Sequence, residues 1–100
     1  MEKRIPHYSL ALIKAEVSRS GPSAFTKTAL DGGRDIGLTS MEMIAVIGSL
    51  SRSDFYKSMT SYANHQVWQD VYHKMTPVGK MVYIKLSLQT GKTVIQFKEK

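Results

Sequence analysis

Lysines, tyrosines and glutamines in the second half of the chain are the side chains with types and spacing that could do chemistry. The set consists of Tyr56, Lys57, Gln69, Tyr83, Lys85, Gln96 and Lys98. Cutting RNA without a metal requires a base for the 2′-hydroxyl proton, a cation near the phosphorus and an acid for the leaving 5′-oxygen. Ammonium, amide and phenol groups could supply all three.

The acid and the base would both come from groups that are protonated in water. Lysine and tyrosine have pKa values of about 10.4 and 10, so both begin as acids at neutral pH. Crowded ammonium groups lower one another's pKa, because like charges disfavour the charged form, and the same positive field lowers the pKa of a neighbouring phenol. A lysine–tyrosine cluster could therefore provide acid and base without histidine.

The same residues also have ordinary structural explanations. A tyrosine that faces a lysine across a hairpin is a common surface pair, worth about 0.2–1 kcal/mol. Lys57 alone could be a solvated strand residue, and we expect Trp68 in the core rather than as a platform for bases. Asp54 and Asp70 could form a carboxylate pair, but turn and strand-edge roles explain them equally well.

Metal and cofactor motifs are missing from the sequence. There is no G-x-x-x-x-G-K, G-x-G-x-x-G or H-E-x-x-H motif, and cysteine is absent. The histidines, His7, His65 and His73, are scattered, and Asp70 and His73 would point to opposite faces of a strand. We therefore expect neither a metal site nor a cofactor.

The last 20 residues predict the hairpin that would position part of the set. Apolar and polar residues alternate from Val82 to Leu88, which is the period of a half-buried strand. Thr90-Gly91 predicts a two-residue turn, and 93–98 returns as the partner strand. In that register Tyr83 faces Lys98 and Lys85 faces Gln96 on a mostly polar face, while Ile84 faces Phe97 and Leu86 faces Ile95 on an apolar face.

The rest of the chain predicts helices first and strands second. Apolar spacing and capping signals predict helices over 7–20, from an N-cap at Thr26 to about Arg34, and after a capping box at Thr39. Gly37 is expected at the C-terminal end of the second helix, which Gly32 and Gly33 should weaken by about 1 kcal/mol each. Strands are predicted over 55–62 and 66–75, joined by turns at 63–65 and 76–79.

This order indicates one α+β domain over 1–100, with a helical half (1–50) and a sheet half (51–100). The helices should pack on one face of a four-stranded antiparallel sheet. The chain holds 14 Lys and Arg against 8 Asp and Glu, for a net charge of +6, so it should attract polyanions, although surplus lysine on a soluble domain is an equal explanation. With no membrane span and no signal segment visible, we expect a cytoplasmic protein without membrane contact.

Long ordered motifs resemble one known family. They are Ser53-Asp54-Phe55-Tyr56-Lys57-Ser58-Met59-Thr60, Trp68-Gln69-Asp70-Val71-Tyr72, Val82-Tyr83-Ile84-Lys85, Phe97-Lys98-Glu99-Lys100 and the start, Met1-Glu2-Lys3-Arg4 with Pro6-His7. The chain resembles the motility quorum-sensing regulator toxins (MqsR) of bacterial toxin–antitoxin modules. The resemblance runs nearly end to end, with a looser match over 18–50.

The resemblance implies a RelE-like fold and an mRNA interferase, an endoribonuclease that cleaves mRNA without metal at GCU-type sites and arrests growth. It implies catalytic roles for Lys57, Gln69, Tyr83 and Lys98, with Tyr56 and Lys85 as RNA contacts. Lys57 and Lys98 would clamp phosphate and transfer protons, Tyr83 would be acid or base, and Gln69 would orient phosphate or a base edge.

The implied partner is a cognate MqsA-like antitoxin with a zinc-binding N-terminal part and a DNA-binding C-terminal part. DNA would then be reached only through the antitoxin, since no basic recognition helix is visible in this chain. Stress response, biofilm and quorum-sensing roles belong to the same implication.

Two other functions remain open from the residues. The basic face could bind RNA without cutting it, as a regulator that acts only with its partner. A sheet edge could instead accept a strand of the antitoxin, which would make the chain a protein-interaction domain.

Overall fold

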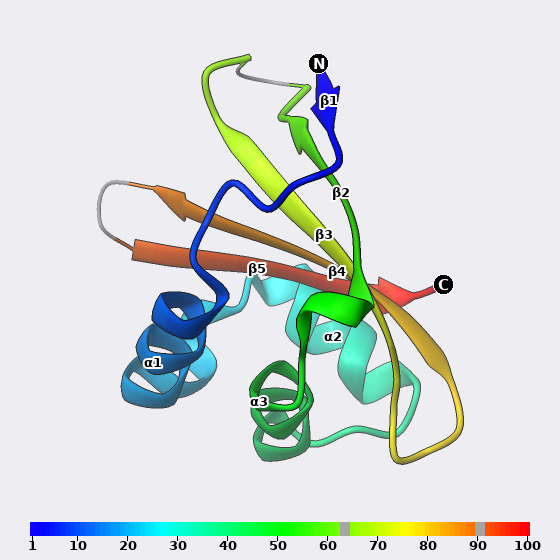
Figure 1. Ribbon diagram of the computed structural model, residues 1–100. Helices are drawn as coiled ribbons and strands as arrows, with labels where there is room; N and C mark the ends of the chain where they lie inside the picture. The colour runs from blue at the N-terminus through cyan, green and yellow to red at the C-terminus, as the bar shows by residue number, and fades with distance from the viewer. Residues whose placement is uncertain (63–64, 90–91) are drawn as a thin grey trace.

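The structure, a computed structural model, describes residues 1–62, 65–89 and 92–100. In this part of the chain, a helical layer packs under one antiparallel sheet, whose strands follow the order β1-β2-β3-β4-β5 (Figure 1). The helical elements are α1 (Leu10–Ser20), α2 (Lys27–Asp35), α3 (Ser40–Gly48) and the 3-10 turns η1 (Gly21–Ala24) and η2 (Arg52–Asp54). The strands are β1 (Glu2–Lys3), β2 (Phe55–Thr60), β3 (Trp68–Met75), β4 (Met81–Gln89) and β5 (Lys92–Glu99). The expected α+β class is confirmed, and the layers are consistent with a RelE-like arrangement.

The predicted register of the last hairpin is confirmed. Tyr83 pairs with Lys98, Lys85 with Gln96, and Ile84 with Phe97. The predicted turn at Thr90-Gly91 lies outside the described residues. Along the hairpin the apolar face is buried, and its members Val82, Ile84, Leu86, Ile95 and Phe97 are at most 2% exposed. They form one core with Ile13, Val17, Ala29, Met43, Val46, Ile47 and Leu50 from the helical half.

Helix starts follow the capping residues rather than the first apolar residue. The Thr26 and Thr39 caps are confirmed, and Thr39 forms a full capping box with Glu42. The first helix begins at Leu10 after an N-cap at Ser9, so the predicted start at His7 is wrong. The segment before the helix is bound by Asp70, whose carboxylate accepts the backbone N–H groups of His7 (2.9 Å) and Tyr8 (2.8 Å).

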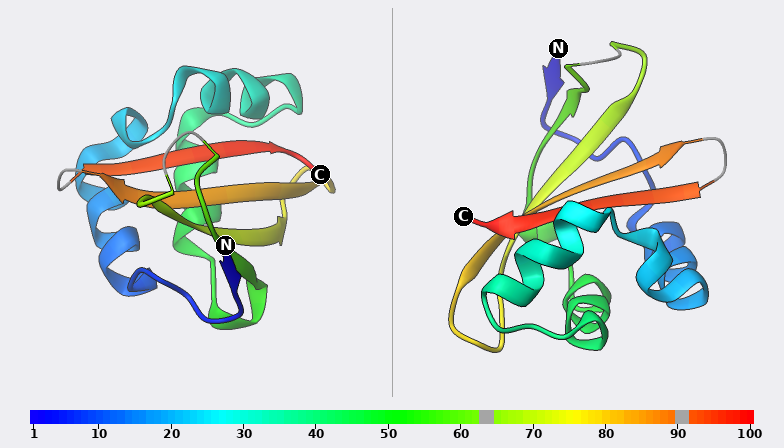
Figure 2. Two further views of the ribbon diagram at one scale, coloured as in Figure 1. Left: turned by 90° about the horizontal axis from the view of Figure 1, so that it is seen from above. Right: turned by 180° about the vertical axis from the view of Figure 1, so that it is seen from behind.

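The glycines of α2 allow close packing. A Cβ at Gly33 would lie 2.2 Å from the Met43 sulfur, and one at Gly32 would lie 2.9 Å from the carbonyl oxygen of Phe97. The helix therefore lies tightly against α3 and β5, as the right-hand view of Figure 2 shows for β5. The low helix propensity of glycine is the cost of this approach. Gly37 follows the helix with φ of 94°, as expected for its C-terminal end.

The sheet has an additional strand that the sequence did not predict. Glu2 and Lys3 pair with Met59 and Ser58 of β2, so the N-terminus forms one edge of the sheet (Figure 1). The predicted strands 55–62 and 66–75 are each about two residues too long, and the turn residues 63–64 lie outside the described part.

Trp68 is not a core residue, contrary to expectation. Its indole is half-buried and stacks on the His7 ring at a centroid distance of 5.3 Å, and Nζ of Lys3 lies 4.2 Å from its centroid. Trp68 lies near the end of the sheet where β1 adds Lys3, beyond the main cluster of core residues. It therefore packs against the N-terminal segment instead of the helices.

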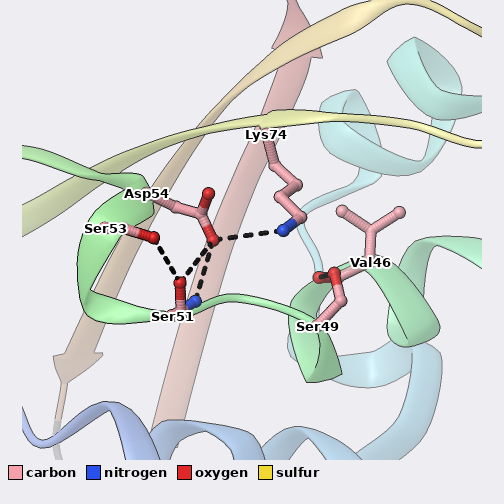
Figure 3. Close-up of polar contacts among 6 residues, drawn as sticks. All are labelled: Val46, Ser49, Ser51, Ser53, Asp54 and Lys74. Atoms are coloured by element: carbon pink, nitrogen blue, oxygen red, sulfur yellow. Dashed lines mark hydrogen bonds and ion pairs between the residues drawn. The ribbon is translucent and has the colours of Figure 1, made fainter.

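Asp54 connects the segment that leaves the helical half to strand β3 through a hydrogen bond and an ion pair (Figure 3). Its carboxylate accepts the Ser51 backbone N–H at 2.8 Å and pairs with Nζ of Lys74 on β3 at 3.3 Å. Burial acts to raise the pKa of Asp54, but these two partners outweigh it and leave the pKa below its ordinary value. Asp54 and Asp70 are thus each occupied structurally, and they do not form a carboxylate pair.

Candidate functional site

The sheet face opposite the helices carries the candidate residues, and we call it the open face. Side chains alternate along each strand, so residues of one parity share a face. Because Val82, Ile84 and Leu86 face the helices, Tyr83 and Lys85 face the other side. The ladder partners extend this set across the sheet. The open face carries Lys57 and Met59 of β2, Gln69, Val71 and His73 of β3, Tyr83 and Lys85 of β4, and Gln96 and Lys98 of β5.

A row of rings crosses the open face and ends in an ammonium group. Tyr56 stacks on His73 with centroids 4.6 Å apart, and His73 lies 5.3 Å from the Tyr83 ring. Nζ of Lys98 lies 5.8 Å from the Tyr83 centroid, and Nζ of Lys85 lies 5.7 Å from it. The phenol at the centre of the face is thus flanked by two cations.

A second row lies one step along the strands. Lys57, Val71, Lys85 and Gln96 are successive ladder partners. Val71 has no exposed surface although it lies on the open face, so its neighbours cover it completely. Nζ of Lys57 lies 5.4 Å from the Tyr56 centroid, which joins the two rows. The predicted residues Tyr56, Lys57, Tyr83, Lys85 and Lys98 therefore form one continuous patch.

The lysines of this patch do not all have the same acidity. Burial, followed by the charges of Lys98 and Lys57, lowers the pKa of Lys85. Lys57 behaves oppositely: its hydrogen bond to the Glu2 carboxylate raises its pKa. The expectation that crowding would lower the pKa of each lysine therefore holds for Lys85 and is wrong for Lys57.

Gln69 shares the open face but lies apart from the phenol. It pairs with Met59 of β2 and is 9% exposed. Four residues separate it from His73 on β3, a span of about 13 Å. Gln69 therefore lies on the same face as Tyr83 but away from its ring.

His73 lies among the candidate residues, although the sequence motifs did not point to it. It pairs with Tyr83 and lies between that ring and Tyr56. Burial, then the charge of Lys100, lowers the pKa of His73, so the ring is neutral at pH 7. His73 lies on the same face as Gln69, because side chains alternate along a strand and the two residues are an even number of positions apart. The alternation of β3 could have revealed it.

A cavity of about 360 Å³ adjoins the patch at the edge of the sheet. Thr26 and Thr28 from the start of α2 form one side, and Tyr83, Lys85, Gln96 and Lys98 form the other. The start of α2 is held there because Thr26 N–H donates to the carbonyl oxygen of Ile95 at 3.0 Å. This contact also occupies part of the outer edge of β5.

The described residues contain no group of three or more metal-ligating side chains. In that same part of the chain, no helix is long and apolar enough to cross a membrane. The arrangement offers ammonium groups and phenols to an anionic partner.

Fold and face together define a small α+β protein with a cationic sheet surface centred on a phenol. The sequence model of the family described as "Motility quorum-sensing regulator, toxin of MqsA" matches residues 5–99, and the chain belongs to this toxin family. It is similar to the mRNA interferase toxin MqsR of Escherichia coli (strain K12), with 43% identity over 100 residues that cover 100% of both chains.

Proposed function

We propose that this chain is the toxin of a type II toxin–antitoxin module and an mRNA interferase. It cuts mRNA at short GCU-type sites without a metal, and thereby arrests translation and growth. The observation that carries the proposal is the Tyr83 ring with Nζ of Lys85 and Lys98 at 5.7 and 5.8 Å on an open sheet face. The similarity to the E. coli relative, which is named an mRNA interferase toxin, supports it.

The reaction requires two proton transfers at one phosphodiester. The 2′-oxygen attacks phosphorus and loses its proton to a base, while the bond to the 5′-oxygen breaks and that oxygen receives a proton from an acid. Tyr83 and Lys98 transfer these protons. Because its pKa is lowered, Lys85 is unprotonated more often at neutral pH than an ordinary lysine, and the free amine can accept a proton. Lys57, with its raised pKa, clamps the phosphate as a cation.

Gln69 and Tyr56 contact the RNA beside the cleaved bond. Tyr56 is 45% exposed at the outer end of the ring row, where an unpaired base can stack on it. Gln69 offers an amide, which can pair with a base edge. These two residues make the cleavage sequence-selective.

The toxin is held inactive by an MqsA-like antitoxin in the cytoplasm. The family description names MqsA as its counterpart. In this proposal the antitoxin supplies the zinc-binding and DNA-binding parts, so the toxin is associated with DNA indirectly.

The test is RNA cleavage by the purified chain in EDTA. A short unstructured RNA that contains GCU should be cut, with 2′,3′-cyclic phosphate or 3′-phosphate ends identified by mass spectrometry. A matched RNA with the GCU changed should be cut more slowly. RNA that stays intact while it binds with a salt slope near roughly −3, for about four phosphates, would establish the non-catalytic RNA-binding alternative instead.

A further inference from the structure

The first residues of the chain are fixed beside the candidate site by the backbone. Glu2 and Lys3 pair with Met59 and Ser58 of β2. The Thr60 N–H donates to the carbonyl oxygen of Met1 at 3.0 Å, and the Met1 ammonium group donates to the Thr60 hydroxyl at 3.2 Å. The position of Glu2 is therefore set by the sheet and not by its own side chain.

The side chain of Glu2 reaches into the open face. Its carboxylate accepts a hydrogen bond from Nζ of Lys57 and forms an ion pair with it. The Lys57 side chain is only 19% exposed, whereas that of Glu2 is 49% exposed. The Lys57 side chain is thus the more buried partner of the pair, and the carboxylate is the more exposed one.

Lys57 and Lys85, which lie in the same row, have pKa values that are shifted in opposite directions. The hydrogen bond and charge of Glu2 raise the pKa of Lys57, and the same contact lowers the pKa of Glu2. The pKa of Lys85, in the same row, is lowered. Groups whose environments push their pKa values apart can divide acid and base roles between them.

We propose that Glu2 is a positioning residue of the candidate site, whose contact with Lys57 aims the ammonium group of this lysine across the open face at the RNA phosphate. An ammonium group has three N–H donors, so Lys57 can keep Glu2 and still donate to a phosphate oxygen. The Glu2 carboxylate also repels the RNA phosphate. Glu2 therefore positions Lys57 but weakens the binding of RNA. This inference rests on the proposed function for its substrate.

The charged and titratable surroundings of Lys57 come from each neighbouring strand. They are Glu2, Arg4 and the Met1 ammonium group on the β1 side, Tyr56 on β2, His73 on β3, Tyr83 and Lys85 on β4, and Lys98 on β5. Among residues 1–62, 65–89 and 92–100, Glu2 supplies the carboxylate that pairs with Lys57, so replacing it removes this contact.

The first measurement needs no RNA. Protein without a tag and with ¹³C-labelled lysine is titrated by NMR, and the Lys57 signal is assigned by its loss in Lys57→Arg. The Lys57 midpoint should move to lower pH in Glu2→Gln. It should stay at the wild-type value in Glu16→Gln, which removes a carboxylate paired with Arg19 on α1. Equal midpoints in Glu2→Gln and wild type would overturn the inference.

The second measurement is the split between KM and kcat. Glu2→Gln should lower KM for a short RNA by roughly threefold, the effect of one unit charge several ångström away in water. It should also lower kcat and move the alkaline limb of the pH profile of kcat to lower pH. Glu16→Gln should leave KM, kcat and the pH profile at their wild-type values. Glu2→Asp, which keeps the charge but shortens the reach, should retain the wild-type KM with a reduced kcat.

An unchanged KM, kcat and pH profile in Glu2→Gln would refute the positioning role. If the chain cuts no RNA at all, the proposed function fails, while the NMR titration still decides whether Glu2 contacts Lys57 and raises its pKa.

Discussion

Nζ of Lys98 lies 5.8 Å from the centre of the Tyr83 ring, and the two residues are direct partners in the β4–β5 ladder. The backbone register therefore fixes the pair, and two buried partners, Ile84 and Phe97, fix the register next to it. A one-residue slip of β5 against β4 would turn Lys98 toward the core and separate it from Tyr83.

The pair is the first target for mutation. Tyr83→Phe keeps the ring against His73 but removes the phenol, and Lys98→Ala removes the ammonium group. Each should lower kcat on GCU-containing RNA by roughly 10²–10⁴-fold if these groups transfer protons. The control is Lys14→Ala on α1, which removes one positive charge from the other layer and should keep kcat. Wild-type kcat in both site variants would remove the catalytic assignment.

His73 should make stability depend on pH. Its pKa is lowered by burial, and its buried Nε2 has no hydrogen-bond partner among the described residues. The unfolded chain, with a histidine pKa near 6.5, then binds more protons than the folded chain. The free energy of unfolding should therefore fall as pH falls from about 6.5 toward the folded pKa.

Urea unfolding at several pH values checks this, and His73→Phe, which keeps a ring between the tyrosines, should flatten the slope. The matched variant His65→Phe, at an exposed position, should keep the wild-type slope. A steep slope that persists in His73→Phe would assign the effect to another group.

The Asp54–Lys74 ion pair should contribute modestly to stability. The two side chains are 18% and 27% exposed, so a double-mutant cycle with Asp54→Asn and Lys74→Met should give a coupling energy of about 0.2–1 kcal/mol. Because the pKa of Asp54 is lowered, this contribution is present above the unfolded pKa and is lost as pH falls through the folded pKa. Urea unfolding at pH 7 should reveal the coupling, and zero coupling there would contradict the assignment.

Gly33 and Gly48 should respond oppositely to alanine. A Cβ at Gly33 would overlap the Met43 side chain, so Gly33→Ala should destabilise by about 1–3 kcal/mol despite a better helix propensity. A Cβ at Gly48, the last residue of α3, meets nothing within 4 Å, and Gly48→Ala should stabilise by about 0.4–1 kcal/mol. Thermal unfolding should show a lower melting temperature for Gly33→Ala and a higher one for Gly48→Ala. Equal shifts of the two melting temperatures would contradict the packing argument.

Local patterns were enough to predict much of the fold. Alternation along β4 and β5 gave the register that places Tyr83 opposite Lys98, and the Thr26 and Thr39 caps gave two helix starts. These features depend on residues near one another in the chain, so periodicity and capping chemistry can be read directly. The first helix start was wrong because Ser9 is the N-cap, and the residues before it are bound by Asp70, more than 60 positions away.

By itself, the sequence determined the α+β order of elements, the last hairpin and the membership of Tyr83, Lys85, Gln96 and Lys98 in one face. Only the tertiary structure decided that β1 pairs with β2 and that Glu2 contacts Lys57 across 55 positions. A two-residue strand has no period to read, and its partner is selected by the packing of the whole sheet edge. The same holds for the pKa of Lys57, which depends on a neighbour that folding brings to it.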